Sequence, residues 1–200
     1  AQYGLWLLRP RAVREFRALL GQTDGRLQQL ASWLPVLEGM SHALREEDPQ
    51  ALERLFDQHW PGAQLDYDLQ SVSFYSTAGR LIGRWDDGSL PTSIPKEWIG
   101  RVARDEQPLF SLVCNQSCFQ VGVLPLLVEE DNAAILVLTA SVAELIVRFR
   151  EITGNDIGLL VNSSRMQDVA QESVRTLQPW GMEVAALSDA LARVSDMRIF

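Results

Sequence analysis

The sequence predicts an α/β protein of the α+β type, in which long N-terminal helices precede an antiparallel β-sheet. Apolar residues recur at helical spacing over residues 4–60, and short runs with alternating apolar and polar residues follow from residue 65 to residue 139. Hydrophobic residues make up 46% of the 200-residue chain. Because that content is enough to fill a core, we exclude a disordered chain.

The N-terminal helical region, residues 1–60, contains breaks that its sequence predicts. The Thr-Asp-Gly sequence at 23–25 indicates an irregularity, and Pro35 must break or kink the helix. Asp48 and Pro49 predict a new helix start, because Asp caps helices and Pro suits the first helical position. We expect that helix to end at the Trp-Pro-Gly sequence of residues 60–62.

Residues 61–155 are expected to form the sheet. Strands at 65–75 and 80–85 flank a Ser-Thr-Ala-Gly turn, and a helix follows at 95–105. A hairpin over residues 109–128 and a buried strand at 133–139 complete five strands. A capping box, Ser141 to Glu144, opens a helix that ends at Gly154. Two strands, a helix and three more strands is the order of a PAS-like fold.

Residues 156–200 are expected to form a partial, membrane-proximal second α/β unit. Strands are predicted at 156–161 and 182–187, and helices at 166–177 and 188–194. The segment is too short for a full PAS-like sheet, so we expect the second unit to be truncated.

Charge and hydropathy narrow the classes of partner. The formal net charge of −8 disfavours binding to nucleic acid or to anionic lipid. No apolar stretch approaches the ~18–20 residues that span a bilayer. The chain begins at Ala1 without a signal peptide, so we expect it to be part of a longer protein.

The two cysteines, Cys114 and Cys118, lie at the expected tip of the 109–128 hairpin. One interpretation is a disulfide that fixes the turn, which would place the protein outside the cytosol. A second is a reduced, redox-responsive pair. A third is half of a metal site, although structural zinc needs four ligands and His42 and His59 are the only histidines.

Nothing in the sequence indicates catalysis. The glycines form no phosphate-binding motif, and the acidic clusters lie in expected turns, where solvation explains them. The histidines have no nucleophile partner, and Lys96, the only lysine, lies at an expected helix start. We therefore predict no catalytic residue, no metal and no cofactor.

A polar strand face is the best candidate for a ligand site. Small polar residues share strand parity with Tyr75 and Gly122, opposite to the apolar residues of the same strands. We expect one face of the sheet to pack on the long helices, and the inserted segment to cover the polar face as a pocket. The predicted ligand-binding residues are Ser73, Tyr75, Trp85, Trp98, Ser111 and Gln120. The alternative is an ordinary solvated face.

Four passages carry a resemblance to a known family. They are a helix-loop-helix at 37–52, the sequence Ser-Phe-Tyr-Ser-Thr-Ala-Gly-Arg-Leu at 73–81, the cysteine hairpin at 114–126, and the strand and helix at 134–154. Residues 36–162 resemble the double-Cache-like extracytoplasmic sensor domains of bacterial membrane signalling proteins. These domains commonly precede diguanylate cyclase, phosphodiesterase or histidine kinase modules. The amino-acid-binding motif of the better-known double Cache receptors has no convincing match here.

The resemblance implies a periplasmic domain that senses a ligand or stimulus for a membrane-anchored signalling protein. The domain would pass a conformational change to a cytoplasmic output module, with cyclic-di-GMP turnover as the expected output. The expected partners are an unknown small-molecule ligand and a second copy of the chain, paired through apolar positions of residues 5–20. One alternative is a cytosolic thiol-based redox switch or enzyme that uses Cys114 and Cys118. Another is a structural ectodomain that binds only a partner protein.

Overall fold

The computed structural model describes residues 10–86, 94–114, 118–128, 131–154, 158–162, 175–177 and 182–187. Contacts divide the chain into two compact units. The sheet unit comprises Gln22–Leu112 and Gln120–Ser141, and the terminal unit comprises Ala1–Gly21, Val113–Phe119 and Val142–Phe200. None of the described helices is long and apolar enough to span a bilayer.

The first helix, α1, runs without interruption over Pro10–Trp33. The predicted irregularity at 23–25 is wrong, because α1 accommodates its glycines at exposed positions. A Cβ atom added at Gly21 or Gly25 would meet nothing within 4 Å, so packing does not require glycine there. The predicted break at Pro35 is confirmed: a 3₁₀ turn, η1, occupies Leu34–Val36.

Two short helices follow. α2 spans Met40–Arg45 and α3 spans Pro49–Phe56. The predicted start of α3 is confirmed, since the Asp48 carboxylate accepts hydrogen bonds from the backbone N–H groups of Gln50 and Ala51 at 3.0 and 3.1 Å. These bonds satisfy donors that have no partner within the helix.

A fourth helix, α4, covers Trp60–Tyr67, where the sequence predicted a helix end and then a strand. That prediction is wrong because Pro61 lies in the first turn of α4. Backbone N–H groups in the first turn have no acceptor within the helix, so a proline there costs no hydrogen bond. Asp68 then adopts a left-handed conformation, with φ of 53°, and ends the helix. The first strand therefore begins at Leu69 rather than at residue 65.

The predicted order of five strands with an inserted helix is confirmed. The strands are β1 (Leu69–Tyr75), β2 (Leu81–Asp86), β3 (Leu109–Cys114), β4 (Cys118–Val128) and β5 (Asp131–Ser141), and α5 (Lys96–Asp105) lies between β2 and β3 in sequence. In space the order is β2-β1-β5-β4-β3, so the last strand, β5, lies at the centre. β1 is antiparallel to both β2 and β5.

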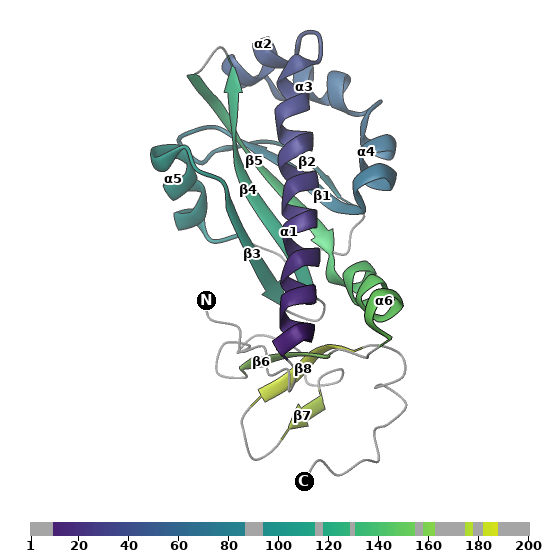
Figure 1. The fold of residues 1–200 in the computed structure, drawn as a ribbon. Helices are drawn as coiled ribbons and strands as arrows, with labels where there is room; N and C mark the ends of the chain where they lie inside the picture. Colours follow the sequence, from purple (N-terminus) through teal and green to yellow (C-terminus); the bar gives the residue numbers. More distant parts are fainter. Residues whose placement is uncertain are drawn as a thin grey trace. The chain divides into compact units, whose positions relative to one another are not determined.

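The long helices pack on one face of this sheet, and α1 crosses in front of it in Figure 1. The main core joins α1 residues such as Leu27 and Leu30 to Phe74 of β1 and Leu136 of β5. The buried apolar residues of the chain include Val72, Phe74, Phe119, Val121, Ile135, Leu136 and Phe149.

The second face of the sheet is also covered. α5 packs against β5, and its residues Ile99 and Val102 are buried without belonging to the helix-side core. Val121 and Val137 are both buried, and the residues next to them along β4 and β5 face the long helices. Because strand side chains alternate, these two valines face the α5 side. We call this second surface of the sheet the α5 face.

The terminal unit contains the first part of α1, the helix α6 (Val142–Thr153) and a second sheet. Phe16 of α1 meets Phe149 of α6 edge to face, with ring centroids 6.1 Å apart. The second sheet has the order β6-β8-β7, from Gly158–Asn162, Met182–Leu187 and Arg175–Leu177. The predicted strands near 156–161 and at 182–187 are confirmed. The helix predicted at 166–177 falls partly on β7, and residues 163–174 and 188–194 lie outside the described residues.

Candidate ligand-binding face

The strand register places a row of hydroxyl groups on the α5 face. Ser71 pairs with Thr139 across β1 and β5, and Ser73 pairs with Val137. Directly paired residues on antiparallel strands share a face. The Ser71 and Thr139 hydroxyl oxygens lie 2.7 Å apart and form a buried hydrogen bond. Two polar residues on neighbouring strands thus satisfy each other inside an otherwise apolar layer.

Tyr75 and Arg84 extend this row toward β2. Arg84 pairs with Ser73 across β1 and β2, so its side chain starts from the same face. Burial raises the pKa of the Tyr75 hydroxyl, and the positive charge of Arg84 offsets part of that rise. The Arg84 guanidinium also donates to the Asp86 carboxylate at 2.7 Å. The row therefore combines neutral donors and acceptors with an ion pair at its more exposed end.

Ser111 and Trp98 complete the set of predicted residues on this side. The neighbour of Ser111, Phe110, packs against the helix-side core, so Ser111 faces the opposite way. Trp98 precedes the buried Ile99 on α5 and is itself half-buried. The structure thus brings Ser73, Tyr75 and Ser111 to one face, with Trp98 on the helix that covers it.

Trp85 lies on the other side of the sheet, which corrects the predicted face. It pairs with Val72, and its ring meets Phe56 and Phe74 edge to face at 4.8 and 5.7 Å. The indole N–H donates to the Asp57 carboxylate at 2.6 Å. The reason is the alternation along β2, where Arg84 and not Trp85 shares the face of Ser73. Trp85 therefore belongs to the packing between β2 and α3.

Gln120 and Gly122 also face the long helices, and their predicted placement with Ser73 is wrong. The Gln120 amide donates a hydrogen bond to the Asp24 carboxylate of α1. A Cβ atom at Gly122 would lie 3.3 Å from the Leu27 side chain and 3.0 Å from that of Phe110. Only glycine lets α1 approach the strand so closely.

An acid–amide contact joins Asp24 and Gln120 on the helix side of the sheet. Gln120 is 3% exposed and Asp24 is half-buried. Burial raises the pKa of Asp24, and the hydrogen bond from Gln120 offsets part of the rise.

Part of the predicted disulfide lies beyond the described side chains. Cys118 begins β4, is 4% exposed and is not a free thiol. The side chain of Cys114 lies outside the described residues. The Cys114–Cys118 disulfide therefore stays a prediction, which mass spectrometry of the unreduced protein tests.

On the described residues, the α5 face offers hydroxyl groups and the ion pair between Arg84 and Asp86. No three or more His, Cys, Asp or Glu side chains of the described part gather as a metal site. The sequence prediction missed Arg84 and Thr139. Arg84 was detectable because it alternates with the apolar Trp85, whereas Thr139 required the pairing of β1 with β5.

Solved structures resemble the chain in fold. One is a domain of a Vibrio parahaemolyticus protein assigned to the sensory box/GGDEF family, with 15% identity, coverage of 84% of this chain and 70% of that chain, and a TM-score of 0.51. Another is the extracellular domain of vpHK1S-Z8, assigned as a histidine kinase, with 15% identity, coverage of 70% and 57%, and a TM-score of 0.47. A third is the sensor domain of the V. cholerae histidine kinase DctB, with 10% identity, coverage of 83% and 71%, and a TM-score of 0.46.

The assignment of the chain to a family rests on a family model and not on these distantly related structures. No curated protein sequence matches the chain. The model described as the double sensory domain of two-component sensor kinase matches residues 11–196, nearly the whole chain. That span includes both the five-stranded sheet and the second, smaller sheet. The chain therefore belongs to the dCache_3 family of double sensory domains.

Proposed function

We propose that the chain is the periplasmic sensory domain of a membrane-anchored signalling protein. The observation that carries this proposal is the match of a sensory-domain family over residues 11–196. The family description supplies the sensory role. The periplasmic location is a further part of our proposal. A disulfide between Cys114 and Cys118 would fit an oxidising compartment.

The α5 face is the proposed ligand site. Its row of Ser71, Ser73 and Thr139 hydroxyls is buried in an apolar layer, and the ion pair between Arg84 and Asp86 lies at one end. Small-molecule sites are usually apolar with a few placed polar groups, and this face has that composition. Binding there would alter the packing of α5 on β5, and the ligand would shift the domain between two conformations only if it binds one of them better.

The output is proposed to be a cytoplasmic enzyme module. One structure of similar fold comes from a sensory box/GGDEF family protein, and two others come from proteins described as histidine kinases. These names support an output in cyclic-di-GMP turnover or in phosphoryl transfer, of which we propose the first.

Thermal unfolding in the presence of small metabolites tests the ligand site. Amino acids, dicarboxylates, polyamines and sugars serve as probes, and a ligand at about 100 times its dissociation constant should stabilise the domain by about 2.7 kcal/mol. Ser73→Ala and Tyr75→Phe should remove that shift, because each deletes a hydroxyl from the α5 face.

Gln29→Ala is the control, because Gln29 is exposed on α1, away from this face. A ligand that stabilises the Ser73 and Tyr75 variants as strongly as the unaltered protein would show that the α5 face is not the site.

A further inference from the structure

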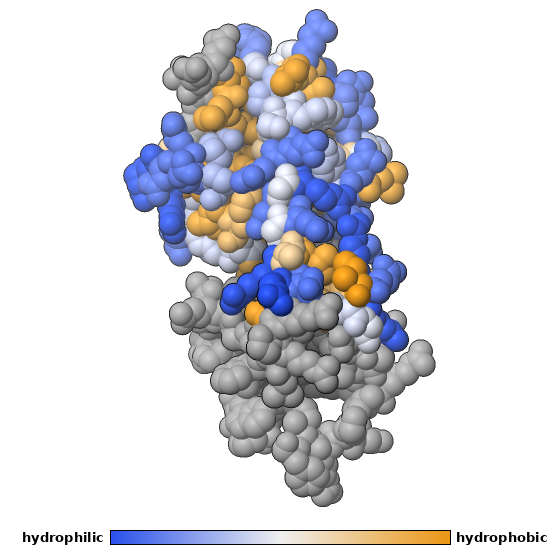
Figure 2. Space-filling model, in the orientation of Figure 1, coloured by the Kyte–Doolittle hydropathy of each residue, from blue (hydrophilic) through white to orange (hydrophobic). Residues whose placement is uncertain are grey.

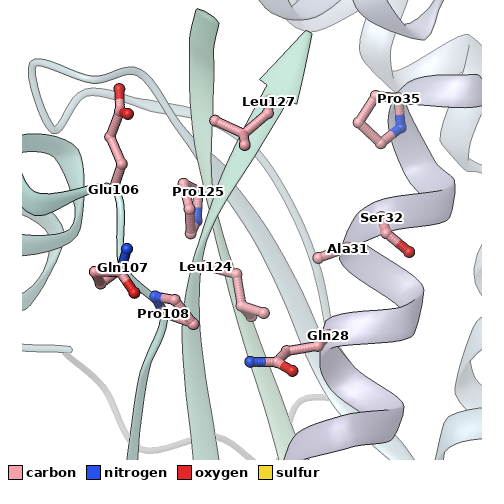
Figure 3. A pocket seen from close by; sticks show the side chains of 10 residues that line it. All are labelled: Gln28, Ala31, Ser32, Pro35, Glu106, Gln107, Pro108, Leu124, Pro125 and Leu127. Carbon is pink, nitrogen blue, oxygen red and sulfur yellow. The ribbon is translucent and has the colours of Figure 1, made fainter. Parts of the chain in front are cut away.

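A groove lies at the outer edge of the sheet unit, beside the C-terminal part of β4. Its walls are α1, through Gln28 and Ser32, and the link between α5 and β3, through Glu106 and Pro108 (Figure 3). Its floor is the C-terminal part of β4, and its volume is about 500 Å³. Figure 2 shows apolar side chains gathered over this part of the surface, between α5 and α1. The groove is large enough for a small ligand or a short peptide, since such sites span about 300–1,000 Å³.

The floor of the groove is a strand edge that its neighbour does not cover. β3 has 6 residues and β4 has 11, and three residues connect them. The hairpin partner can therefore pair with β4 only as far as about residue 123. Beyond that point, no described strand lies beside β4 on its outer edge, while β5 pairs on its inner edge.

Pro125 reveals which backbone groups point outward. Proline has no backbone N–H to donate to a neighbouring strand, so within a sheet its nitrogen faces the strand edge that is not paired. The carbonyl of the same residue points the same way, as do both backbone groups two residues later. The outer edge thus offers the carbonyls of Pro125 and Leu127 and the N–H of Leu127.

We propose that this groove binds an extended peptide that carries a basic side chain, added as a short strand beside residues 124–128 of β4. Main-chain hydrogen bonds to an open strand edge are a recurring way to hold peptides. The side chains that line the groove include one formal charge on the described residues, the carboxylate of Glu106. A basic side chain beside Glu106 would complement it, whereas an acidic one would be repelled. The exposed Leu127 and the buried Leu124 both line the groove and add apolar contact.

Peptide binding to the purified protein tests the proposal. The probe is a fluorescent, capped pentapeptide of alternating lysine and valine, and its control is the same peptide with N-methylated backbone amides. The unmodified peptide should bind at concentrations up to about 1 mM, the weak end of specific recognition. The N-methylated peptide should lose at least about tenfold in affinity, because it cannot donate to the β4 carbonyls (about 1.4 kcal/mol per tenfold).

Two pairs of variants sharpen the test. Leu127→Pro removes the outward N–H while leaving the pairing with β5, so it should abolish binding, whereas Leu127→Ala should keep it. Glu106→Gln should weaken the lysine peptide but not a threonine–valine peptide. Amide hydrogen exchange at Leu127 in the unaltered protein should slow when the lysine peptide is added, which does not depend on any variant folding. Equal binding of both peptide backbones, undiminished binding to Leu127→Pro, no slowing at Leu127, or no binding at all would each overturn the proposal.

Discussion

At the scale of single residues, Asp24 carries a consequence for stability. Burial raises the pKa of its carboxyl group. A raised pKa in the folded protein means that folding favours the protonated form, so the stability that this group contributes is full at low pH. It is lost as the pH rises from the ordinary value of about 4 through the folded pKa.

Replacing Asp24 with asparagine should therefore stabilise the protein at neutral pH. The asparagine side chain is neutral at every pH and keeps an oxygen for the Gln120 amide, so it avoids the cost of a half-buried charge. The gain over the unaltered protein should shrink as the pH falls toward about 4. Urea denaturation at several pH values measures it.

Asp66→Asn is the control, since it makes the same chemical change at an exposed position of α4. A gain for the Asp24 variant that is the same at all pH values would contradict this account.

For single residues, the sequence predicted whether a side chain is buried better than it predicted the face of the sheet on which the side chain lies. Both faces of the sheet are covered, one by α1 to α4 and the other by α5, so an apolar residue can point either way and still be buried. This is why Trp85 and Gln120 were assigned to the wrong face. Gly122 held the missing signal, because a glycine inside a strand often marks a close approach of another element.

At the scale of elements, the cap of α3 is the feature that a single substitution tests most directly. Asp48→Ala removes the acceptor for two backbone N–H groups and should destabilise the protein by about 1 kcal/mol. Asp48→Ser should restore most of that loss, because serine also caps helices. Thermal or urea denaturation compares the three proteins, and an equal loss for alanine and serine would mean that the cap is not the cause.

The elements that the sequence predicted well are those with local chemical signals. Asp48 with Pro49 and the proline at 35 act within one helical turn, so their effects did not depend on the rest of the fold. Pro61 carries the same type of signal as Pro49, but the preceding tryptophan and the following glycine favoured a helix end. Residues 60–67 are helical because α4 packs Ala63 into the core, a tertiary contact that no local pattern contains.

At the scale of the whole molecule, the pairing of two copies is expected to depend on which side chains of the N-terminal part of α1 are accessible. Phe16 and Leu19 are buried within the protein itself, so they are not free to form the expected seam. Val13 and Leu20 are half-buried and seven residues apart, on one stripe of the helix. We propose that pairing, where it occurs, uses this stripe.

Cysteine crosslinking in the membrane-embedded parent protein measures this pairing. Cysteines at positions 13 or 20 should crosslink two copies, because the stripe would bring like positions together. A cysteine in place of Ala18 should not, since Ala18 is exposed on the opposite side of the helix. Equal crosslinking at all three positions, or none at 13 and 20 in folded protein, would argue against this seam.

The sensory class was predictable at this scale, whereas the ligand was not. The order of strands and helices, together with passages such as residues 73–81, was enough to indicate the family. The ligand of the proposed site would depend on which side chains meet on the α5 face. That set is fixed by pairing between Ser71 and Thr139, which are 68 positions apart, and periodicity does not specify such long-range pairing.

The two exposed glycines of α1 have a mechanical consequence. Gly21 and Gly25 lie one turn apart, and the division between the compact units falls directly after Gly21. Each glycine lowers the local stability of a helix by about 1 kcal/mol relative to alanine. Packing does not require a glycine at either position, because an added Cβ atom would meet no neighbouring atom. We therefore expect residues 21–25 to be the part of α1 that bends most readily when a load acts along the helix.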